Sequence, residues 1–382
     1  MIRKTVYART RKDCQKKLMD LRHRSASGSL IAEDMTVEDY LRSWLSHSAE
    51  PTVGRGTFVR YRGLVDNYLI PRLGKLKLQK VNATHVEQLY SDLRSDRCPK
   101  SIPRQCHIVL RRAFTVAMEK RLIQFNPCAK GSGVRTPKTT PRPIAPLTKE
   151  QAVRLLTEAE DDRFHALFVL AIHAGLRQGE LLGLKWDNVD LAGGSIRVTH
   201  SLEETSGTFQ LKEPKTKAGR RLVKIPGIAV KALHRHRAMM KSEGLGFSEW
   251  VFPDTIGGAQ RKSNLNRWHW KPLKKAAGLP ETTRFHDLRH THATLLLAAG
   301  THPKVVQERL GHANIVMTLY TYSHVIPSLQ QEAADKLDEL FTVDEPGGSE
   351  ITESGKTGTE LVQNPETKTD QPIEDWSETA CQ

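Results

Sequence analysis

The chain has 382 residues, which exceeds the size of one small domain and predicts two or three domains. It carries 58 Lys and Arg against 43 Asp and Glu, a formal charge of +15, which favours a polyanionic partner such as nucleic acid or an anionic membrane surface. With 38% hydrophobic and 26% charged residues the chain can build ordinary cores, so its composition excludes disorder of the whole chain.

Neither a membrane span nor export is indicated. The longest apolar run, 166–172, is far shorter than the ~20 residues that cross a bilayer, and it predicts a buried core helix. The basic start is not followed by an apolar segment or a cleavage site, so we expect a cytoplasmic protein. Five cysteines are scattered along the chain without a Cys-x-x-Cys pair: Cys14, Cys98, Cys106, Cys128 and Cys381. This pattern indicates reduced thiols rather than disulfides or a zinc site.

Residues 1–30 form a short basic head. Nine Lys or Arg stand there against two Asp, a local charge of +7. An alternating segment over 4–8 precedes a stretch in which Cys14, Leu18 and Leu21 share one helical face. The small residues that follow, from Ser25 on, are expected to end this helix.

Residues 36–128 are predicted to form a helical unit. Four stretches have apolar residues three and four positions apart: 36–45, 57–69, 84–93 and 106–122. Pro71 is expected to end the second helix, and the segment from Thr84 to Glu87 reads as a capping box that opens the third. Arg111 and Arg112 lie away from the apolar face of the fourth helix, which predicts a basic exterior.

A basic linker, 129–147, is expected to separate this unit from a second domain, 148–342. The linker contains four prolines and almost no residues that could build a core. The second domain opens with a capping box, Thr148-Lys-Glu-Gln, and continues with a buried helix over 163–174.

Three strand-like stretches follow, at 195–200, 208–212 and 221–225, and each has alternating polarity between turn residues. The chain then reads as helical to about residue 341. Residues 343–382 have ten acidic residues against two lysines, with many Gly, Ser, Thr and Pro, so we expect an acidic, disordered tail.

Residues suited to chemistry gather in His286-Asp-Leu-Arg289-His290-Thr-His292. In a helix, His286 and Arg289 would share a face. A guanidinium offers a planar fork for two phosphate oxygens, and an imidazole can donate to an oxygen or accept a proton. A further arginine, Arg177, stands at the edge of the buried helix, between glycines that allow backbone and ligand to approach closely.

Two other interpretations of these residues are open. His286, His290 and His292 are conceivable zinc ligands, although no cysteine pairs with them and no His-Glu-x-x-His motif is present, so we expect no metal. Arg177 alone would more often form a structural ion pair with Glu180 than act in catalysis. The functional interpretation therefore depends on the combination of motifs.

That combination resembles the tyrosine recombinases of the phage integrase type. The segment Ala174-Gly-Leu-Arg177-Gln-Gly-Glu180, continued to Asp190, is similar to the first signature box of the family. The second box is matched by three segments: His286-Asp-Leu-Arg289-His-Thr, Leu310-Gly-His312 and Thr321-Tyr322-Ser-His324. The spacing agrees too, with 23 residues from Arg289 to His312 and 10 from His312 to Tyr322, an offset that Tyr320 lacks.

The resemblance covers roughly residues 1–342. It implies a multidomain, mainly α protein, with a helical core-binding domain and a mixed α/β catalytic domain that is mostly α with a small antiparallel sheet. It also implies an enzyme that cuts and rejoins DNA through a 3′-phosphotyrosine intermediate, without metal or cofactor, to integrate and excise a phage or mobile element.

Residue roles follow from the same resemblance. Tyr322 would be the nucleophile, Arg177 and Arg289 would clamp the phosphate oxygens, and His312 would donate a further hydrogen bond. His286 is our candidate for the proton transfer from the tyrosine, and Glu180 would brace the site.

The remaining catalytic group of the family is a lysine on a β-hairpin, which protonates the leaving 5′-oxygen. The segment between our second and third strands offers two lysines. We favour Lys215, which precedes a threonine as in similar segments, and Lys217 is the alternative.

The helical unit and the catalytic domain are expected to clamp double-stranded DNA attachment sites. Basic residues are expected to contact phosphates: Arg3, Lys4, Arg9, Arg11, Lys12, Arg111, Arg112, Lys130, Arg135 and Lys138. The head resembles the end of the arm-site-binding domain of larger integrases. It is either a reduced form of that domain, the remainder of a longer product whose recorded start is internal, or a solvated basic helix.

Recombination joins two duplexes, so a homo-tetramer is expected. Residues 328–341 form an amphipathic stretch that would dock on a neighbouring subunit or pack on its own domain. A host DNA-bending protein and an excision factor are further expected partners. We expect no membrane partner. The protein is expected to act in the bacterial cytoplasm, at the nucleoid.

Three alternatives to an integrase are kept. A chromosome-dimer-resolving recombinase of the same family would usually lack a basic head and an acidic tail. A DNA-binding regulator or architectural factor would have a decayed site, against which the full set of candidate residues argues. A type IB topoisomerase would share the chemistry but not the site preference.

Overall fold

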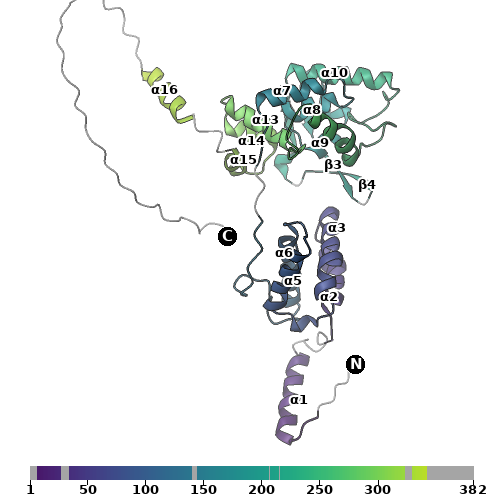
Figure 1. Cartoon of the computed structure of the whole chain (residues 1–382), viewed down its shortest axis with the longest axis vertical. Helices are drawn as coiled ribbons and strands as arrows, with labels where there is room; N and C mark the ends of the chain where they lie inside the picture. Colours follow the sequence, from purple (N-terminus) through teal and green to yellow (C-terminus); the bar gives the residue numbers. More distant parts are fainter. Residues whose placement is uncertain are drawn as a thin grey trace, which may run out of the picture. The chain divides into compact units, whose positions relative to one another are not determined.

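The structure is a computed structural model of the chain and describes residues 7–26, 34–139, 144–205, 207–214, 216–322 and 329–341. The chain divides into two units, Met1–Ile326 and Pro327–Gln382. The first unit contains two large hydrophobic cores with no residue in common, one within 37–128 and one within 147–288. Helices predominate and the sheets are small and antiparallel, which confirms the predicted fold class (Figure 1).

The head contains one helix, α1 (Arg11–Ala26). Thr10 opens this helix, because its hydroxyl accepts the backbone N–H of Asp13 at 3.1 Å and donates to the Asp13 carboxylate at 2.7 Å. On the predicted apolar face, Cys14 is half-buried and Leu18 is 44% exposed. The side chain of Leu21 and most of the alternating segment at 4–8 lie outside the described residues.

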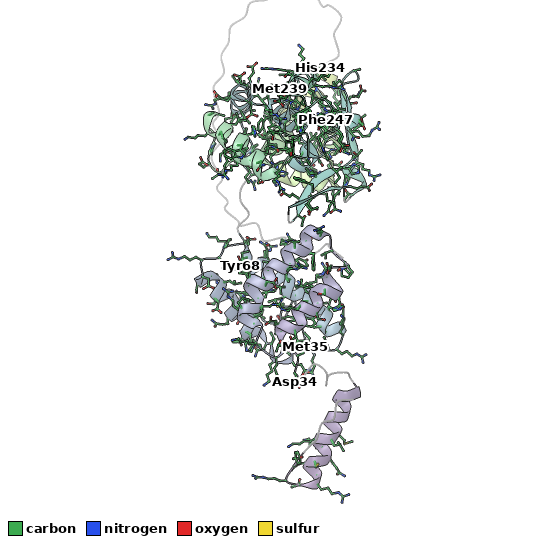
Figure 2. All side chains as sticks on the ribbon, turned by 90° about the vertical axis from the view of Figure 1, so that its right-hand side faces the viewer. Asp34, Met35, Tyr68, His234, Met239 and Phe247 are labelled. Atoms are coloured by element: carbon green, nitrogen blue, oxygen red, sulfur yellow. The ribbon has the colours of Figure 1, made fainter. Side chains whose placement is uncertain are left out.

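The predicted helical unit consists of eight elements: α2 (Val37–Trp44), η1 (Leu45–Ala49), α3 (Arg55–Leu64), η2 (Val65–Leu69), α4 (Ile70–Leu73), η3 (Leu78–Lys80), α5 (Ala83–Ser95) and α6 (Ile102–Glu119). Their apolar faces enclose a core that includes Trp44, Leu89 and Phe114, all fully buried. Met35 and Tyr68, which are labelled in Figure 2, are partly buried against this core.

The prediction that Pro71 ends the second helix is wrong. The helix passes from α3 through the π-helical turn η2 and continues in α4, where the proline occupies the first turn. In the wider turn the N–H of Ile70 donates to Val65, five residues earlier. This local change of hydrogen-bond register accommodates a residue that has no N–H to donate.

Two other helix starts differ from the prediction. The cap of α5 is Asn82 rather than Thr84, because Asn82 Oδ1 accepts the backbone N–H of His85 at 3.2 Å. Helix α6 begins at Ile102, four residues before the predicted start, with Pro103 in its first turn. A proline costs no hydrogen bond there, since the N–H groups of a first turn have no partner within the helix.

The second large core belongs to a body of helices: α7 (Lys149–Glu158), α8 (His165–His173), α9 (Gln178–Leu182), α10 (Gly227–Ser242), α11 (Lys262–Asn264), η6 (Leu265–Trp270), α12 (Lys271–Ala276), α13 (Asp287–Ala298), α14 (Pro303–Leu310) and α15 (Ile315–Tyr322). The predicted capping box at Thr148 is present and opens α7. The residues of the longest apolar run, 166–172, are all buried in α8, as predicted. Figure 1 shows α8 among α7, α10 and α13.

Two antiparallel sheets accompany these helices. One has the order β1–β2–β5, formed by β1 (Val189–Asp190), β2 (Ser195–Val198) and β5 (Arg221–Lys224). The other is a hairpin of β3 (Ser201–Thr205) and β4 (Thr208–Lys212). Strands β1 and β3 were not predicted: β1 is only two residues long, and β3 has a single apolar residue, Leu202, so its polarity does not alternate.

Two short 3-10 turns and a last helix complete the described chain. The 3-10 turns η4 (Trp186–Asn188) and η5 (Lys217–Gly219) precede β1 and β5. Helix α16 (Leu329–Phe341) confirms the predicted helical stretch and leaves Leu340 and Phe341 exposed. No helix in the described part of the chain is long and apolar enough to cross a membrane. The acidic tail, 343–382, lies outside the described residues.

Candidate active site

Glu180 of α9 is buried between two arginines. Its Oε1 accepts from Arg177 Nη1 at 2.7 Å and from Arg221 Nη1 at 3.1 Å, while its Oε2 accepts from Arg221 Nη2 and the backbone N–H of Arg177, both at 2.9 Å. Burial alone would raise the pKa of this carboxyl, but the hydrogen bonds and charges of Arg221 and Arg177 outweigh it and hold the pKa at about 2. Glu180 is therefore ionised at neutral pH and orients both guanidiniums.

Arg177 is the residue before the first turn of α9. Its side chain is 40% exposed, although Glu180 holds one of its nitrogens. The site therefore presents the guanidinium of Arg177 toward solvent at this point.

Three guanidiniums converge on the last turn of α14. Arg221 Nε donates to the carbonyl of Arg309 at 2.6 Å, Arg289 Nη2 to that of Leu310 at 2.5 Å, and Arg177 Nη2 to that of Gly311 at 3.5 Å. We call these three consecutive groups the α14 carbonyl turn (residues 309–311). The last carbonyls of a helix have no partner within the helix, and each here receives an arginine from a different element.

The positions of Arg289 and Arg177 on this turn bring the two signature boxes together. Arg289 is buried, at 3% exposure, and its Nη1 also donates to the carbonyl of Gly175 at 2.8 Å. Gly175 lies two residues before Arg177, so the second box contacts the first directly. Such a concentration of positive charge around one exposed guanidinium suits the binding of a phosphate.

His312 follows the α14 carbonyl turn directly. Its backbone N–H donates to the carbonyl of Gln307 at 3.2 Å, and its carbonyl accepts from Gln307 Nε2 at 2.7 Å. Its ring Nδ1 lies 2.9 Å from Thr318 Oγ1. Burial lowers the pKa of His312 to about 4, and the positive charges of Arg289 and Arg177 add to this effect. The imidazole is therefore neutral at physiological pH.

His286 is the residue before the first turn of α13, three positions before Arg289. Desolvation lowers its pKa, and so do the nearby charges of Arg289 and Arg284. Its ring packs edge to face on that of His290, with 5.0 Å between the ring centroids. Burial lowers the pKa of His290 to about 4.

The alternative of a zinc site receives no support from the geometry. His292 Nδ1 bonds to the carbonyl of Ile172 at 2.8 Å, and Arg309 Nε lies 3.5 Å from His292 Nε2. An arginine beside the second ring nitrogen disfavours a metal cation there. In the described part of the chain, no three His, Cys, Asp or Glu side chains form a group that could hold a metal ion.

Four of the candidate residues are described in part or not at all. Lys215 lies outside the described residues. Lys217 begins η5, between β4 and β5, but its side chain is not described. Tyr322 is the last residue of α15, and Tyr320 belongs to the same helix; the side chains of both lie outside the description.

The glycines of the first box serve contacts within the protein. Gly175 has φ +65°, and a Cβ there would stand 2.5 Å from His292 Cδ2. Gly179 faces the backbone of Leu202 in β3. We predicted that these glycines allow backbone and ligand to approach closely; the structure shows the close approach of α13 and of the β3 backbone.

Two residues of the site were missed by the sequence analysis. Arg221 is 6% exposed and holds both Glu180 and the α14 carbonyl turn. A signal existed, because Arg221 stands two positions before the buried Val223 and so shares its face of β5. Thr318, the partner of His312, gave no signal, since the chain between the two residues has no regular pattern.

The basic residues predicted to contact DNA are exposed wherever they are described. These are Arg9, Arg11, Lys12, Arg111, Arg112, Lys130, Arg135 and Lys138. Arg112 also lies over the ring of Tyr61, with 6.0 Å from its guanidinium carbon to the ring centroid. Arg3 and Lys4 lie outside the described residues.

Comparison with known families agrees with this geometry. Residues 146–328 match the model of the phage integrase family, and residues 36–94 match that of the phage integrase N-terminal SAM-like domain. A tyrosine recombinase XerC-like protein of Caldanaerobacter subterraneus subsp. tengcongensis is 30% identical over 365 residues, which cover 89% of this chain and 93% of the relative.

Solved structures give the same result. The integrase of the Tn1549 transposon, in complex with a circular intermediate DNA, is similar with a TM-score of 0.68 and 25% identity, covering 80% of this chain and all of that one. A lambda integrase tetramer bound to a Holliday junction has the same fold, with a TM-score of 0.58 and 18% identity, covering 83% of this chain and 88% of that one. The chain therefore belongs to the phage integrase family and is a site-specific tyrosine recombinase that breaks and rejoins DNA.

Proposed function

We propose that this recombinase integrates and excises a mobile element through the side chains of the two signature boxes. The observation that carries the proposal is the convergence of Arg177 and Arg289 on adjacent carbonyls of the α14 carbonyl turn, next to His312. A phosphodiester bound beside this turn would meet two guanidiniums and an imidazole N–H. The transition state gains negative charge on its non-bridging oxygens, which these donors would stabilise.

In this mechanism the hydroxyl of Tyr322 attacks the phosphorus and displaces the 5′-oxygen of the DNA. The hydroxyl, with an ordinary pKa near ~10, loses its proton more easily beside positive charge, and His286 is the proposed acceptor. Lys215, with Lys217 as the alternative, protonates the leaving oxygen. The 3′-phosphotyrosine bond conserves the energy of the broken bond, so a second 5′-hydroxyl can reverse the step.

We assign residues 36–128 to core-site binding, 129–147 to a basic linker and 148–342 to catalysis. The exposed arginines of α6 and the basic residues of the linker would hold DNA phosphates and contribute affinity that does not depend on base sequence. The head would add contacts through the exposed Arg9, Arg11 and Lys12.

A homo-tetramer on two attachment sites is proposed, in line with the lambda integrase tetramer on a Holliday junction. The exposed Leu340 and Phe341 of α16 give this helix an apolar end that would dock on a neighbouring subunit. A host DNA-bending protein and an excision factor would regulate direction, and the protein would act in the cytoplasm, at the nucleoid.

The decisive test is the covalent intermediate. A duplex with the core attachment site, nicked so that the short cleaved strand diffuses away, should trap the protein on the DNA in a denaturing gel. Tyr322→Phe should abolish this adduct, because no oxygen remains to attack, while the matched control Tyr320→Phe should keep it. An adduct that persists in Tyr322→Phe would refute the assignment of the nucleophile.

A further inference from the structure

One polar contact of the site links His312 to the helix that follows it. The imidazole of His312 meets the hydroxyl of Thr318, with 2.9 Å between Nδ1 and Oγ1. Thr318 lies in α15 and is fully buried, at 0% exposure. The backbone of His312 is fixed separately by Gln307, so the contact with Thr318 acts on the ring alone.

The direction of this hydrogen bond follows from burial. Within the described part of the chain, Nδ1 of His312 is the one hydrogen-bond partner of the Thr318 hydroxyl. If Nδ1 carried the proton, the hydroxyl hydrogen would be buried without an acceptor, which is costly. The hydroxyl therefore donates to Nδ1, which must be unprotonated.

An unprotonated Nδ1 determines what the other ring nitrogen does. A neutral imidazole has one N–H, and it is then on Nε2. The lowered pKa of His312, about 4, agrees with a neutral ring. In this tautomer Nε2 is a hydrogen-bond donor, whereas in the other tautomer it would be an acceptor and would repel a phosphate oxygen.

The same bond connects the histidine to the helix of the nucleophile. Thr318 and Tyr322 both belong to α15 and are four residues apart, which is one helical turn. A rotation or shift of α15 would therefore break or strain the bond to His312. The contact couples the position of this helix to the orientation of the imidazole.

We propose that Thr318 is a positioning residue that holds His312 as the neutral Nε2–H tautomer, so that Nε2 donates to the scissile phosphate when α15 is in place. This inference rests on the proposed role of His312 in phosphate binding. It assigns no direct contact with DNA to Thr318.

Two substitutions in the full chain separate the hydroxyl from the shape of the side chain. Thr318→Val exchanges the hydroxyl for a methyl group of similar size, and Thr318→Ser keeps the hydroxyl. Thr318→Val should slow adduct formation on the nicked core-site duplex by about 10- to 100-fold, the range found for residues that orient the imidazoles of metal sites through the second ring nitrogen. Thr318→Ser should stay within about threefold of the parent, and both should bind the duplex as the parent does.

The effect of Thr318→Val can also be measured with and without His312, and a purely structural role of Thr318 would give the same effect in both. In a His312→Gln background, Thr318→Val should have no further effect, because the ring that it orients is gone. A full additional loss in that background would mean that Thr318 acts on something else, and equal losses in Thr318→Val and Thr318→Ser would mean that packing matters rather than the hydroxyl. Either result overturns the proposal.

The tautomer itself can be measured without any reaction. Nitrogen-15 NMR of histidine-labelled parent protein, with His312→Gln to assign the signal, should show the proton of His312 on Nε2. A proton on Nδ1 overturns the proposal even if Thr318→Val does not fold. An adduct that still forms in Tyr322→Phe would contradict the proposed function rather than the role of Thr318. The measurement of the tautomer does not depend on that result.

Discussion

At the scale of single residues, the site keeps its ionisable groups in unusual states by burial and pairing. Glu180 stays charged in the interior because two arginines surround it, and its pKa is held at about 2. The histidines behave oppositely: burial lowers the pKa of His312 to about 4 and that of His292 to about 3, with neighbouring arginines adding to the effect. Arginines therefore supply the fixed positive charge, and the imidazoles act as neutral hydrogen-bonding groups.

Because these histidines are neutral in the folded protein, we expect the protein to lose stability in mild acid. When the pKa of a histidine is lower in the folded than in the unfolded state, protons bind preferentially to the unfolded state. The stability of the fold is therefore unaffected by this histidine above pH ~6.5 and falls as the pH drops toward the pKa of the folded state. For His292 this window extends from about 6.5 to about 3. The free energy of unfolding should fall by up to ~1.4 kcal/mol per pH unit for each such histidine.

Urea unfolding of the parent and of His292→Asn at pH 7, 6 and 5 measures this effect. The variant should lose less stability between pH 6 and 5 than the parent. His234→Asn, on the exposed surface of α10, is the matched control and should keep the slope of the parent (Figure 2). Equal slopes for the parent and His292→Asn would contradict the assignment.

At the scale of elements, the α14 carbonyl turn joins β5, α9 and α13 through one arginine each. Such an arrangement uses the directional donors of a guanidinium, which an ammonium group cannot reproduce. Arg221 makes four hydrogen bonds, two to Glu180, one to the carbonyl of Gly219 and one to that of Arg309. We therefore expect β5 to be important for the site although it contributes no group to the reaction.

Arg221→Lys tests this expectation. The substitution keeps the charge but leaves the buried Glu180 and the carbonyl of Arg309 without a shared fork of donors, so the free energy of unfolding should fall by about 1–3 kcal/mol. Its neighbour Arg220 forms an exposed ion pair with Glu213, and Arg220→Lys should change stability by less than ~0.5 kcal/mol. Urea denaturation of both variants measures these free energies of unfolding. Equal values for Arg221→Lys and Arg220→Lys would contradict the proposed importance of β5.

The elements also show what the sequence could predict. Periodicity located α2, periodicity and a capping box located α7, and an unbroken apolar run located α8, because burial of an apolar face or of a whole helix leaves its mark on the sequence. The predictions that failed, a helix end at Pro71 and no strand at β3, have local causes. A π-helical turn accommodates the proline within the helix, and backbone pairing with β4 stabilises β3 despite its polar sequence. Those features depend on hydrogen bonds between backbone groups, which side-chain patterns do not encode.

Within the site, the signature boxes identified Arg177, Glu180, Arg289 and His312, because their spacing resembles that of the family. The structure then showed that the two arginines and the histidine meet at the α14 carbonyl turn. The contacts of Arg221 and Thr318 could not be read from spacing, since they join segments whose separation along the chain is arbitrary. Their discovery required the fold.

At the scale of the whole molecule, charge is divided unequally along the chain. The last forty residues hold ten acids and two lysines, so residues 1–342 carry a net charge of +23 rather than the +15 of the complete chain. The described basic residues that are expected to contact DNA are all exposed. We expect an acidic segment in the same chain to compete with DNA phosphates for these cations.

Removal of residues 343–382 should therefore strengthen DNA binding that is independent of sequence. We expect a several-fold gain in affinity at 50 mM salt that disappears as the salt rises, because screening weakens the competition. Fluorescence anisotropy with a random duplex measures it, and a tail with Asn and Gln in place of Asp and Glu is the control that should match the truncation. A truncated chain with unchanged affinity at low salt would refute the competition.

The α14 carbonyl turn also restricts how the chain can change its length. Because three consecutive carbonyls are each matched to an arginine from a separate segment, one residue inserted directly after Arg309 would rotate the following groups by about 100° and misalign the pairs at Leu310 and Gly311 with that at Arg309. At the exposed turn between β3 and β4 a single carbonyl, that of Gly207, receives an arginine, with 3.5 Å to Arg261 Nη2, and a Cβ added at Gly207 would have nothing within 4 Å. An insertion in the hairpin turn would therefore disturb one exposed contact, while the spacing from Arg309 to His312 has to stay constant to keep three pairs aligned.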